Sequence, residues 1–139
     1  MTSPTRLRIS RREGFNSAHQ LNDPTLSADE NRRRYGKCVN LHGHNYVLEV
    51  VVSGAIDPAT GYVMDLKRLS DLMVAEIIQH VDHRNLNTDV DWLRGRIPTA
   101  ETLALACWAR LEPHLPRRSL KTVRIYETDK NWAECSDDD

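Results

Sequence analysis

The chain has 139 residues, which fits one domain, and we expect a single domain over residues 1–139. Its 19 Lys and Arg residues almost balance its 20 Asp and Glu residues, and the formal charge of -1 argues against a general nucleic-acid-binding protein. No apolar run approaches the roughly 20 residues that cross a bilayer, and residues 1–12 lack the apolar core of a signal peptide. We therefore expect a cytoplasmic protein that does not bind membranes.

The first half of the chain predicts two strands separated by a long polar segment. Partial alternation of polar and apolar residues indicates a first strand over residues 6–18, which ends at His19. Residues 27–37 are rich in charge and lack periodic apolar residues, so they predict a loop. A second strand over residues 44–54 precedes turn residues 57–61, which favour a hairpin into residues 62–64.

The second half predicts two helices and then two strands. Asp65 is a good N-cap for a helix with an apolar face over residues 66–81. Thr99 can cap a second helix, which Pro113 and Pro116 end. Residues 120–126 alternate as a strand does, and residues 131–135 suit a short final strand. This order favours an α+β fold, an antiparallel sheet with helices on one face.

Three histidines are candidate metal ligands. His42 and His44 are two residues apart at the start of the second strand, so their side chains can point to the same face. Gly43 between them lets another backbone approach closely. His19 ends a strand that can lie beside theirs, and three imidazoles with one open position are typical of a catalytic zinc site. The His-Gly-His spacing alone also fits an ordinary hydrogen-bonded pair.

Cys38, four residues before His42, allows two interpretations. As a fourth ligand it would complete a Cys-His-His-His site and make the zinc structural. As a free thiol near a metal or near Lys37 it would act as a base or a nucleophile. The spacing does not distinguish these alternatives.

Asp82, His83 and Glu127 are candidate acid, base and binding groups. A carboxylate beside an imidazole can orient it and suits a proton relay, although a polar helix end explains Asp82 and His83 equally well. Glu127 follows a predicted strand and is either a surface residue or a partner for an amino-pyrimidine ring, such as that of a pterin.

Taken together, these residues resemble the family of 6-pyruvoyl- and 6-carboxy-tetrahydropterin synthases. The motifs occur in the family's order and cover the chain from about residue 6 to residue 128. The matching segments are residues 15–19 (FNSAH), 36–38 (GKC) with 42–46 (HGHNY), 81–87 (VDHRNLN), 98–101 (PTAE) and 126–128 (YET).

The resemblance implies a role for each candidate. The implied zinc ligands are His19, His42 and His44, with Cys38 as a catalytic thiol rather than a ligand. Asp82 and His83 match the relay pair. Glu127 matches the carboxylate that anchors the pterin ring, and Thr99 and Glu101 match positions that line the same pocket.

The resemblance also implies the tunnelling fold, with the whole chain forming one pterin synthase domain. In that fold a four-stranded antiparallel sheet carries two helices on one face, and sheets from several subunits join through their edges into a barrel. Members are usually homohexamers of two stacked trimers, with active sites at subunit boundaries. Such assembly gives exposed edge strands a partner.

The implied substrate is 7,8-dihydroneopterin triphosphate, a small-molecule partner. Zinc would polarise the side-chain hydroxyls, Cys38 would remove a proton, and His83 oriented by Asp82 would transfer the second one while triphosphate is eliminated. The arginine run at residues 32–34 is a candidate contact for that triphosphate, and a solvated loop explains it too.

The spacing from Cys38 to His42 resembles bacterial 6-carboxy-tetrahydropterin synthases of the queuosine (7-deazapurine) pathway. We therefore favour 6-carboxy-tetrahydropterin and acetaldehyde as products. Residues 27–38 and 126–129 resemble the pyruvoyl branch more closely, so 6-pyruvoyl-tetrahydropterin synthase is the alternative. Two non-catalytic alternatives are a pterin-binding module and a structural zinc protein.

Overall fold

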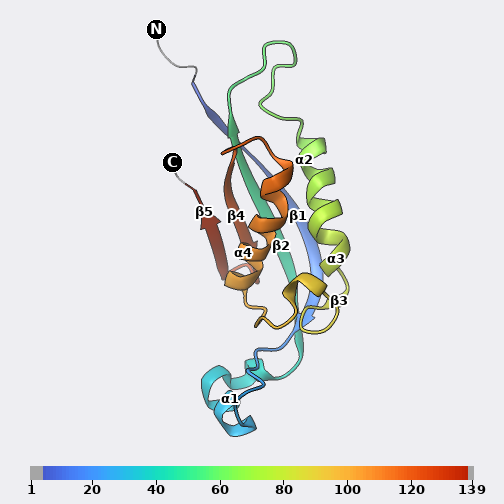
Figure 1. Ribbon diagram of the computed structural model, residues 1–139, viewed down its shortest axis with the longest axis vertical. Helices are drawn as coiled ribbons and strands as arrows, with labels where there is room; N and C mark the ends of the chain where they lie inside the picture. Colours follow the sequence, from blue (N-terminus) through green and yellow to red (C-terminus); the bar gives the residue numbers. More distant parts are fainter. Residues whose placement is uncertain (1–4, 138–139) are drawn as a thin grey trace.

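The computed structural model describes residues 5–137, which form one sheet with helices on one side (Figure 1). The sheet has five strands in the order β3-β1-β2-β4-β5. These strands are β1 (Leu7–His19), β2 (His42–Gly54), β3 (Arg84–Asn85), β4 (Leu120–Tyr126) and β5 (Trp132–Ser136). The four long strands are antiparallel neighbours, as predicted. The predicted number of four strands was wrong by one, because the two-residue β3 pairs in parallel with β1 and is too short to give a sequence pattern.

Two helical segments cover one face of this sheet, as predicted (Figure 1). The first runs without a break through α2 (Leu66–Met73), the π-helical segment η2 (Val74–Ile78) and α3 (Gln79–Val81), and α2 packs on β1. The second is α4 (Ala100–Leu111), which packs on β4 and β5 and continues into the turn η4 (Glu112–His114). No helix within residues 5–137 combines the length and apolar character needed to span a membrane.

The predicted helix caps are both present. The Asp65 carboxylate accepts the N–H of Lys67, and the Thr99 hydroxyl accepts the N–H of Thr102. Each cap satisfies a backbone donor that has no partner within its helix. The two polar residues therefore determine where the helices begin.

The π-helical segment η2 follows from the spacing of the buried residues. Leu69, Met73, Ile77 and Val81 are all fully buried and lie four residues apart. In an α-helix each four-residue step overshoots a full turn by about 40°, so the fourth residue would rotate away from the sheet. The wider π turn reduces this drift and keeps the row of side chains over the sheet.

The core lies between the helices and the inner face of β2. Tyr46, Leu48, Val50 and Val52 alternate with more exposed residues and are at most 2% exposed. Phe15 of β1 lies opposite Tyr46, and the two rings stack with their centroids 4.9 Å apart. Strand alternation thus gives the sheet one apolar face that the helices cover.

The loop predicted for residues 27–37 is instead mostly helical. It contains α1 (Ala28–Tyr35) and the 3-10 turn η1 (Gly36–Val39). The Ser27 hydroxyl accepts the N–H of Glu30, acidic residues occupy the first turn, and three arginines occupy the last turn. The helix lacks an apolar period because it projects from the body of the molecule (Figure 1), and Asn31 is its one buried residue. The prediction weighted periodicity and missed the cap.

The hairpin predicted into residues 62–64 is also absent. Asp57 donates its N–H to the carbonyl of Tyr62, so the turn closes on itself without extending a ladder. Both edges of β2 are already paired, one with β1 and the other with β4. A third strand therefore has no free edge of β2 to join.

Candidate metal centre and active site

The structure brings the three histidines together at one end of the β1–β2 ladder. His19 lies directly opposite His42 in the register, and His44 lies opposite Ser17 on the same face. One ring nitrogen from each histidine lies within 4.8 Å of the others. The ring centroids are 4.7 Å apart for His19 and His42, 5.2 Å for His19 and His44, and 5.0 Å for His42 and His44. This grouping has the donor type and number of a catalytic zinc site.

Gly43 makes the close approach of the two strands possible. A Cβ atom at this position would lie 3.3 Å from the carbonyl oxygen of Ser17 on β1. That distance is shorter than the usual contact, so a side chain would push β1 and β2 apart. The glycine between the two histidines therefore preserves the spacing of their rings from His19.

Backbone carbonyls orient two of the rings. Nδ1 of His19 lies 2.8 Å from the carbonyl oxygen of Pro98, and Nδ1 of His42 lies 2.7 Å from that of Asn40. A carbonyl accepts only, so each Nδ1 carries the proton and donates it, which leaves Nε2 with a free lone pair. This second contact is the usual arrangement behind a metal-ligating histidine.

Two ring nitrogens are buried without a hydrogen-bond partner. Among the described residues, Nε2 of His19 and Nε2 of His44 have no donor or acceptor within reach. Glu127 places Oε1 3.6 Å from Nε2 of His44, which is too far for a hydrogen bond. Buried polar atoms in native proteins are normally paired, so these two nitrogens fit a bound metal ion.

The electrostatics favour the neutral, metal-binding form of the rings. Burial lowers the pKa of His19 and of His44, and the carboxylate of Glu127 opposes this in part. Both imidazoles are therefore neutral at neutral pH, which is the form that coordinates metals.

Cys38 lies near this end of the molecule but outside the cluster of ring nitrogens. It belongs to η1, and its carbonyl accepts the N–H of Leu21, two residues beyond His19. The thiol is partly exposed, and within residues 5–137 the candidate metal-binding group contains the three histidines and no cysteine. This arrangement favours the free-thiol interpretation over a four-ligand site.

Asp82 and His83 form an oriented pair at the edge of β1. Oδ1 of Asp82 accepts the N–H of Asn16 at 2.9 Å and lies 3.0 Å from Nδ1 of His83. The hydrogen bond from Asn16 is the main cause that lowers the pKa of Asp82. His83 has a φ of 61° and a side chain that is 82% exposed. No hydrogen bond, ion pair or ring contact among the described residues joins this pair to the three histidines of the same chain.

The remaining candidates lie in different surroundings. Glu127 follows β4 and faces His44, so the structure places it beside the histidines. Thr99 uses its hydroxyl to cap α4 and to bond Thr102, which gives it a structural role. Glu101 is exposed in the first turn of the same helix.

Two residues that position His19 were missed in the sequence. The Tyr46 hydroxyl lies 3.3 Å from Nδ1 of His19, and Pro98 provides the carbonyl described above. Tyr46 shares the two-residue period of His42 and His44, so the alternation of β2 could have identified it. Pro98 gave no signal, because every residue has a carbonyl.

Comparisons with known proteins agree with this geometry. The family model described as 6-pyruvoyl tetrahydropterin synthase matches residues 8–138. The chain is 44% identical to 6-pyruvoyl tetrahydrobiopterin synthase of Homo sapiens over 125 residues, which are 88% of this chain and 86% of the relative. It is 41% identical to the protein of the same name from Dictyostelium discoideum, over 90% of this chain and 92% of that one.

A solved structure agrees over nearly the whole fold. The 6-pyruvoyl tetrahydropterin synthase of Caenorhabditis elegans superimposes with a TM-score of 0.90 and 35% identity, covering 99% of both chains. Sequence, fold and the grouping of three histidines lead to one conclusion: the chain belongs to the 6-pyruvoyl tetrahydropterin synthase family.

Proposed function

We propose that this protein is a zinc-dependent lyase that converts 7,8-dihydroneopterin triphosphate to 6-pyruvoyl-tetrahydropterin and triphosphate. The observation that carries the proposal is the cluster of His19, His42 and His44, with two buried ring nitrogens that have no partner among the described residues. Enzymes of this family are metal-dependent lyases that act on dihydroneopterin triphosphate.

The product follows the relatives rather than one loop spacing. The short interval from Cys38 to His42 favoured 6-carboxy-tetrahydropterin, but the similarity to proteins named 6-pyruvoyl tetrahydrobiopterin synthase extends over 125 residues at 41% and 44% identity. A match along the whole chain outweighs the length of a single connection. The comparisons give no support to a place in queuosine biosynthesis.

Zinc would be held by the ring nitrogens of the three histidines that do not face carbonyls or solvent. When bound, it polarises hydroxyl groups of the substrate side chain and makes neighbouring protons more acidic. Pro98 and Asn40 hold the rings of His19 and His42 in the required tautomer through their carbonyl oxygens. The site is thereby arranged before the metal arrives.

Two side chains would transfer the protons. In this proposal Sγ of Cys38 removes a proton from the substrate side chain. Asp82 accepts a hydrogen bond from Nδ1–H of His83, which leaves Nε2 of His83 to take up or return the second proton as triphosphate departs. Glu127, Thr99 and Glu101 are the proposed contacts of the pterin ring, with the whole chain forming the synthase domain.

Assembly explains why the relay pair points away from its own histidines. His83 is exposed at the edge of β1, and family members are oligomeric. Among the described residues, β5 has no strand on its outer side, and β1 is paired with β3 at Ser17 and Ala18 alone. We propose that these edges join copies of the chain into a hexamer of two trimers, in which Asp82 and His83 serve the histidines of a neighbouring subunit.

The product is tested by incubating the zinc-loaded protein with 7,8-dihydroneopterin triphosphate and identifying the products by mass spectrometry. We expect 6-pyruvoyl-tetrahydropterin with release of triphosphate. Formation of 6-carboxy-tetrahydropterin with acetaldehyde would overturn the proposed product, and the absence of any turnover would revive a pterin-binding module.

The role of Cys38 is tested by Cys38→Ala. We expect this variant to keep one zinc per chain by elemental analysis and to lose turnover by about 100-fold or more, the usual effect of removing a general base. Cys135→Ala is the matched control, because Cys135 is also a partly exposed thiol but lies on β5. Loss of zinc from Cys38→Ala would contradict the catalytic-thiol assignment.

A further inference from the structure

A second cavity lies at the opposite end of the sheet from the histidines. It has a volume of about 690 Å³ and is lined by the end of β2, the loop over residues 55–65, the start of α2 and the turn before β4. β2 runs from His42 at one end to Gly54 at the cavity, a span of roughly 40 Å at the usual rise per residue. The cavity is therefore separate from the candidate metal centre.

Three arginines line this cavity without an acidic partner. Arg6, Arg68 and Arg117 come from the beginning of the chain, from α2 and from the turn before β4. Within residues 5–137 none of them has a carboxylate at ion-pair distance, whereas Arg12 and Arg124 on the open face of the sheet pair with Glu49 and Glu134. Three guanidinium groups from distant parts of the sequence thus share one cavity.

The carboxylates in the cavity do not compensate these charges by contact. Asp57 accepts the N–H of Ala59 at 2.9 Å, and Asp65 accepts the N–H of Lys67 at 2.9 Å as the cap of α2. His114 also lines the cavity, but its Nε2 lies 3.3 Å from Oε1 of Glu76. Local structure therefore engages these groups and leaves the three guanidinium groups for a ligand.

We propose that this cavity binds a small molecule carrying a diphosphate or a triphosphate. Guanidinium groups bind phosphate oxygens through paired N–H donors, and several of them are needed to neutralise a polyphosphate chain. The volume suits a ligand of nucleotide size, and Tyr62 in the lining offers an aromatic face beside the arginines. This inference does not depend on the proposed enzymatic function.

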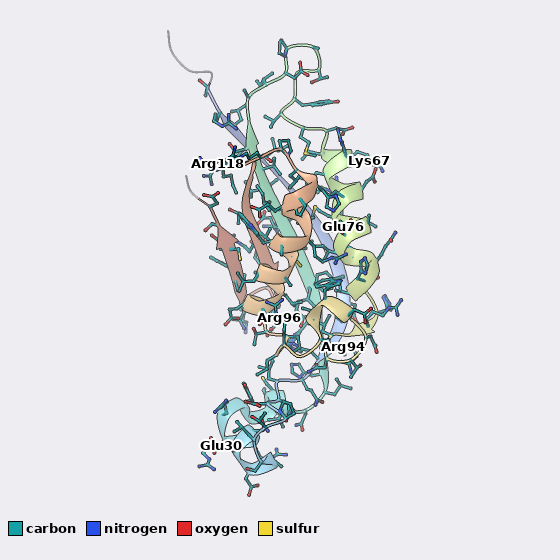
Figure 2. The ribbon with its side chains drawn as sticks, in the orientation of Figure 1. Glu30, Lys67, Glu76, Arg94, Arg96 and Arg118 are labelled. Atoms are coloured by element: carbon teal, nitrogen blue, oxygen red, sulfur yellow. The ribbon has the colours of Figure 1, made fainter. Side chains whose placement is uncertain are left out.

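The test measures binding of inorganic tripolyphosphate to the metal-free full-length chain by calorimetry. We expect one site per chain, with affinity reduced about tenfold or more by Arg68→Ala and by Arg117→Ala, because each variant loses charge-assisted hydrogen bonds. The matched control is Lys67→Ala, which removes the same charge beside Arg68 but from a side chain that pairs with Asp71 and does not line the cavity (Figure 2). The control should bind like the unmodified protein.

A variant at the other end of the molecule separates this cavity from the histidine end. Arg32→Ala alters the exposed helix α1, and we expect it to leave tripolyphosphate binding unchanged. Binding that is weakened by Arg32→Ala or Lys67→Ala as much as by Arg68→Ala would overturn the proposal, as would the absence of binding at millimolar tripolyphosphate.

ATP distinguishes an inorganic from an organic ligand. If ATP binds more tightly than tripolyphosphate, and Tyr62→Ala removes that difference, the aromatic group contributes and the ligand is organic. Equal affinity supports recognition of the phosphate chain alone. If Arg68→Ala and Arg117→Ala alter neither interaction, the arginines are not the binding groups and the proposal fails.

Discussion

The inner face of β2 carries two different kinds of side chain along one strand. From Tyr46 to Val52 the inward residues are apolar and fully or almost fully buried beneath the helices. At His42 and His44 the same alternation continues, but the inward side chains are imidazoles that meet His19. The geometry of the strand is the same in both halves, and only the groups that face it differ.

This comparison shows how a hydrophobic sheet positions a polar site. Packing under the helices fixes the direction of every inward side chain on β2, including the two that lie beyond the apolar core. The apolar half is stabilised by burial, whereas the histidine half contains buried nitrogens that have no partner among the described residues. The first half therefore supplies stability and the second half supplies binding.

The largest expected effect separates the two halves through stability. Leu48→Ala removes a fully buried side chain from the centre of the apolar half. We expect it to lower the free energy of unfolding by about 2–5 kcal/mol, because the neighbouring side chains cannot close the cavity completely. Urea denaturation of the metal-free protein measures this loss. Folded Leu48→Ala protein should still bind zinc, and loss of its zinc would contradict the division between the halves.

The reverse substitution tests the histidine half. His44→Ala removes one of three ligand groups from the same face of the same strand, so we expect zinc affinity to fall by at least about 100-fold. The free energy of unfolding of the metal-free protein should change by less than about 1 kcal/mol, because the removed nitrogen has no hydrogen bond to lose. Competition with a coloured chelator measures the affinity.

A histidine outside the cluster provides the control for this experiment. His80 lies near the end of α3, where its Nε2 contacts the carbonyl of Ala75. His80→Ala should bind zinc with unchanged affinity. If His80→Ala weakened zinc binding as much as His44→Ala, the three clustered histidines would not be the metal site.

Much of the fold could be predicted because its elements bury one regular face. The strand over residues 120–126 and the caps Asp65 and Thr99 were identified from alternation and from polar residues that precede apolar runs. Helix α1 was missed because it projects from the body and needs no apolar face. Its beginning was still encoded in the spacing of Ser27 and Glu30, which is a capping signal.

The candidate site divides in the same way. His42 and His44 were placed on one face by the period of the strand, and the register of β1 then brought His19 opposite them. The carbonyl of Pro98 could not be predicted, because a backbone group leaves no trace in the residue type. The exposed position of His83 depends on a backbone φ of 61° at the turn, which its sequence neighbours do not specify.

The smallest expected effect concerns the edge where the two halves meet. Asp82 accepts the N–H of Asn16 and lies beside His83, and these contacts hold the pKa of its carboxyl group below the ordinary value of 3.8. A carboxylate with a lowered pKa stabilises the folded state above the ordinary value, and this contribution is lost as the pH falls through the lowered pKa. Asp82→Asn should therefore reduce the free energy of unfolding near neutral pH by less than about 1 kcal/mol, because 38% of the side chain is exposed to solvent. Urea denaturation from about pH 7 to about pH 3 should show the two proteins converging in acid, and a difference that stays constant with pH would exclude the charge of Asp82 as its source.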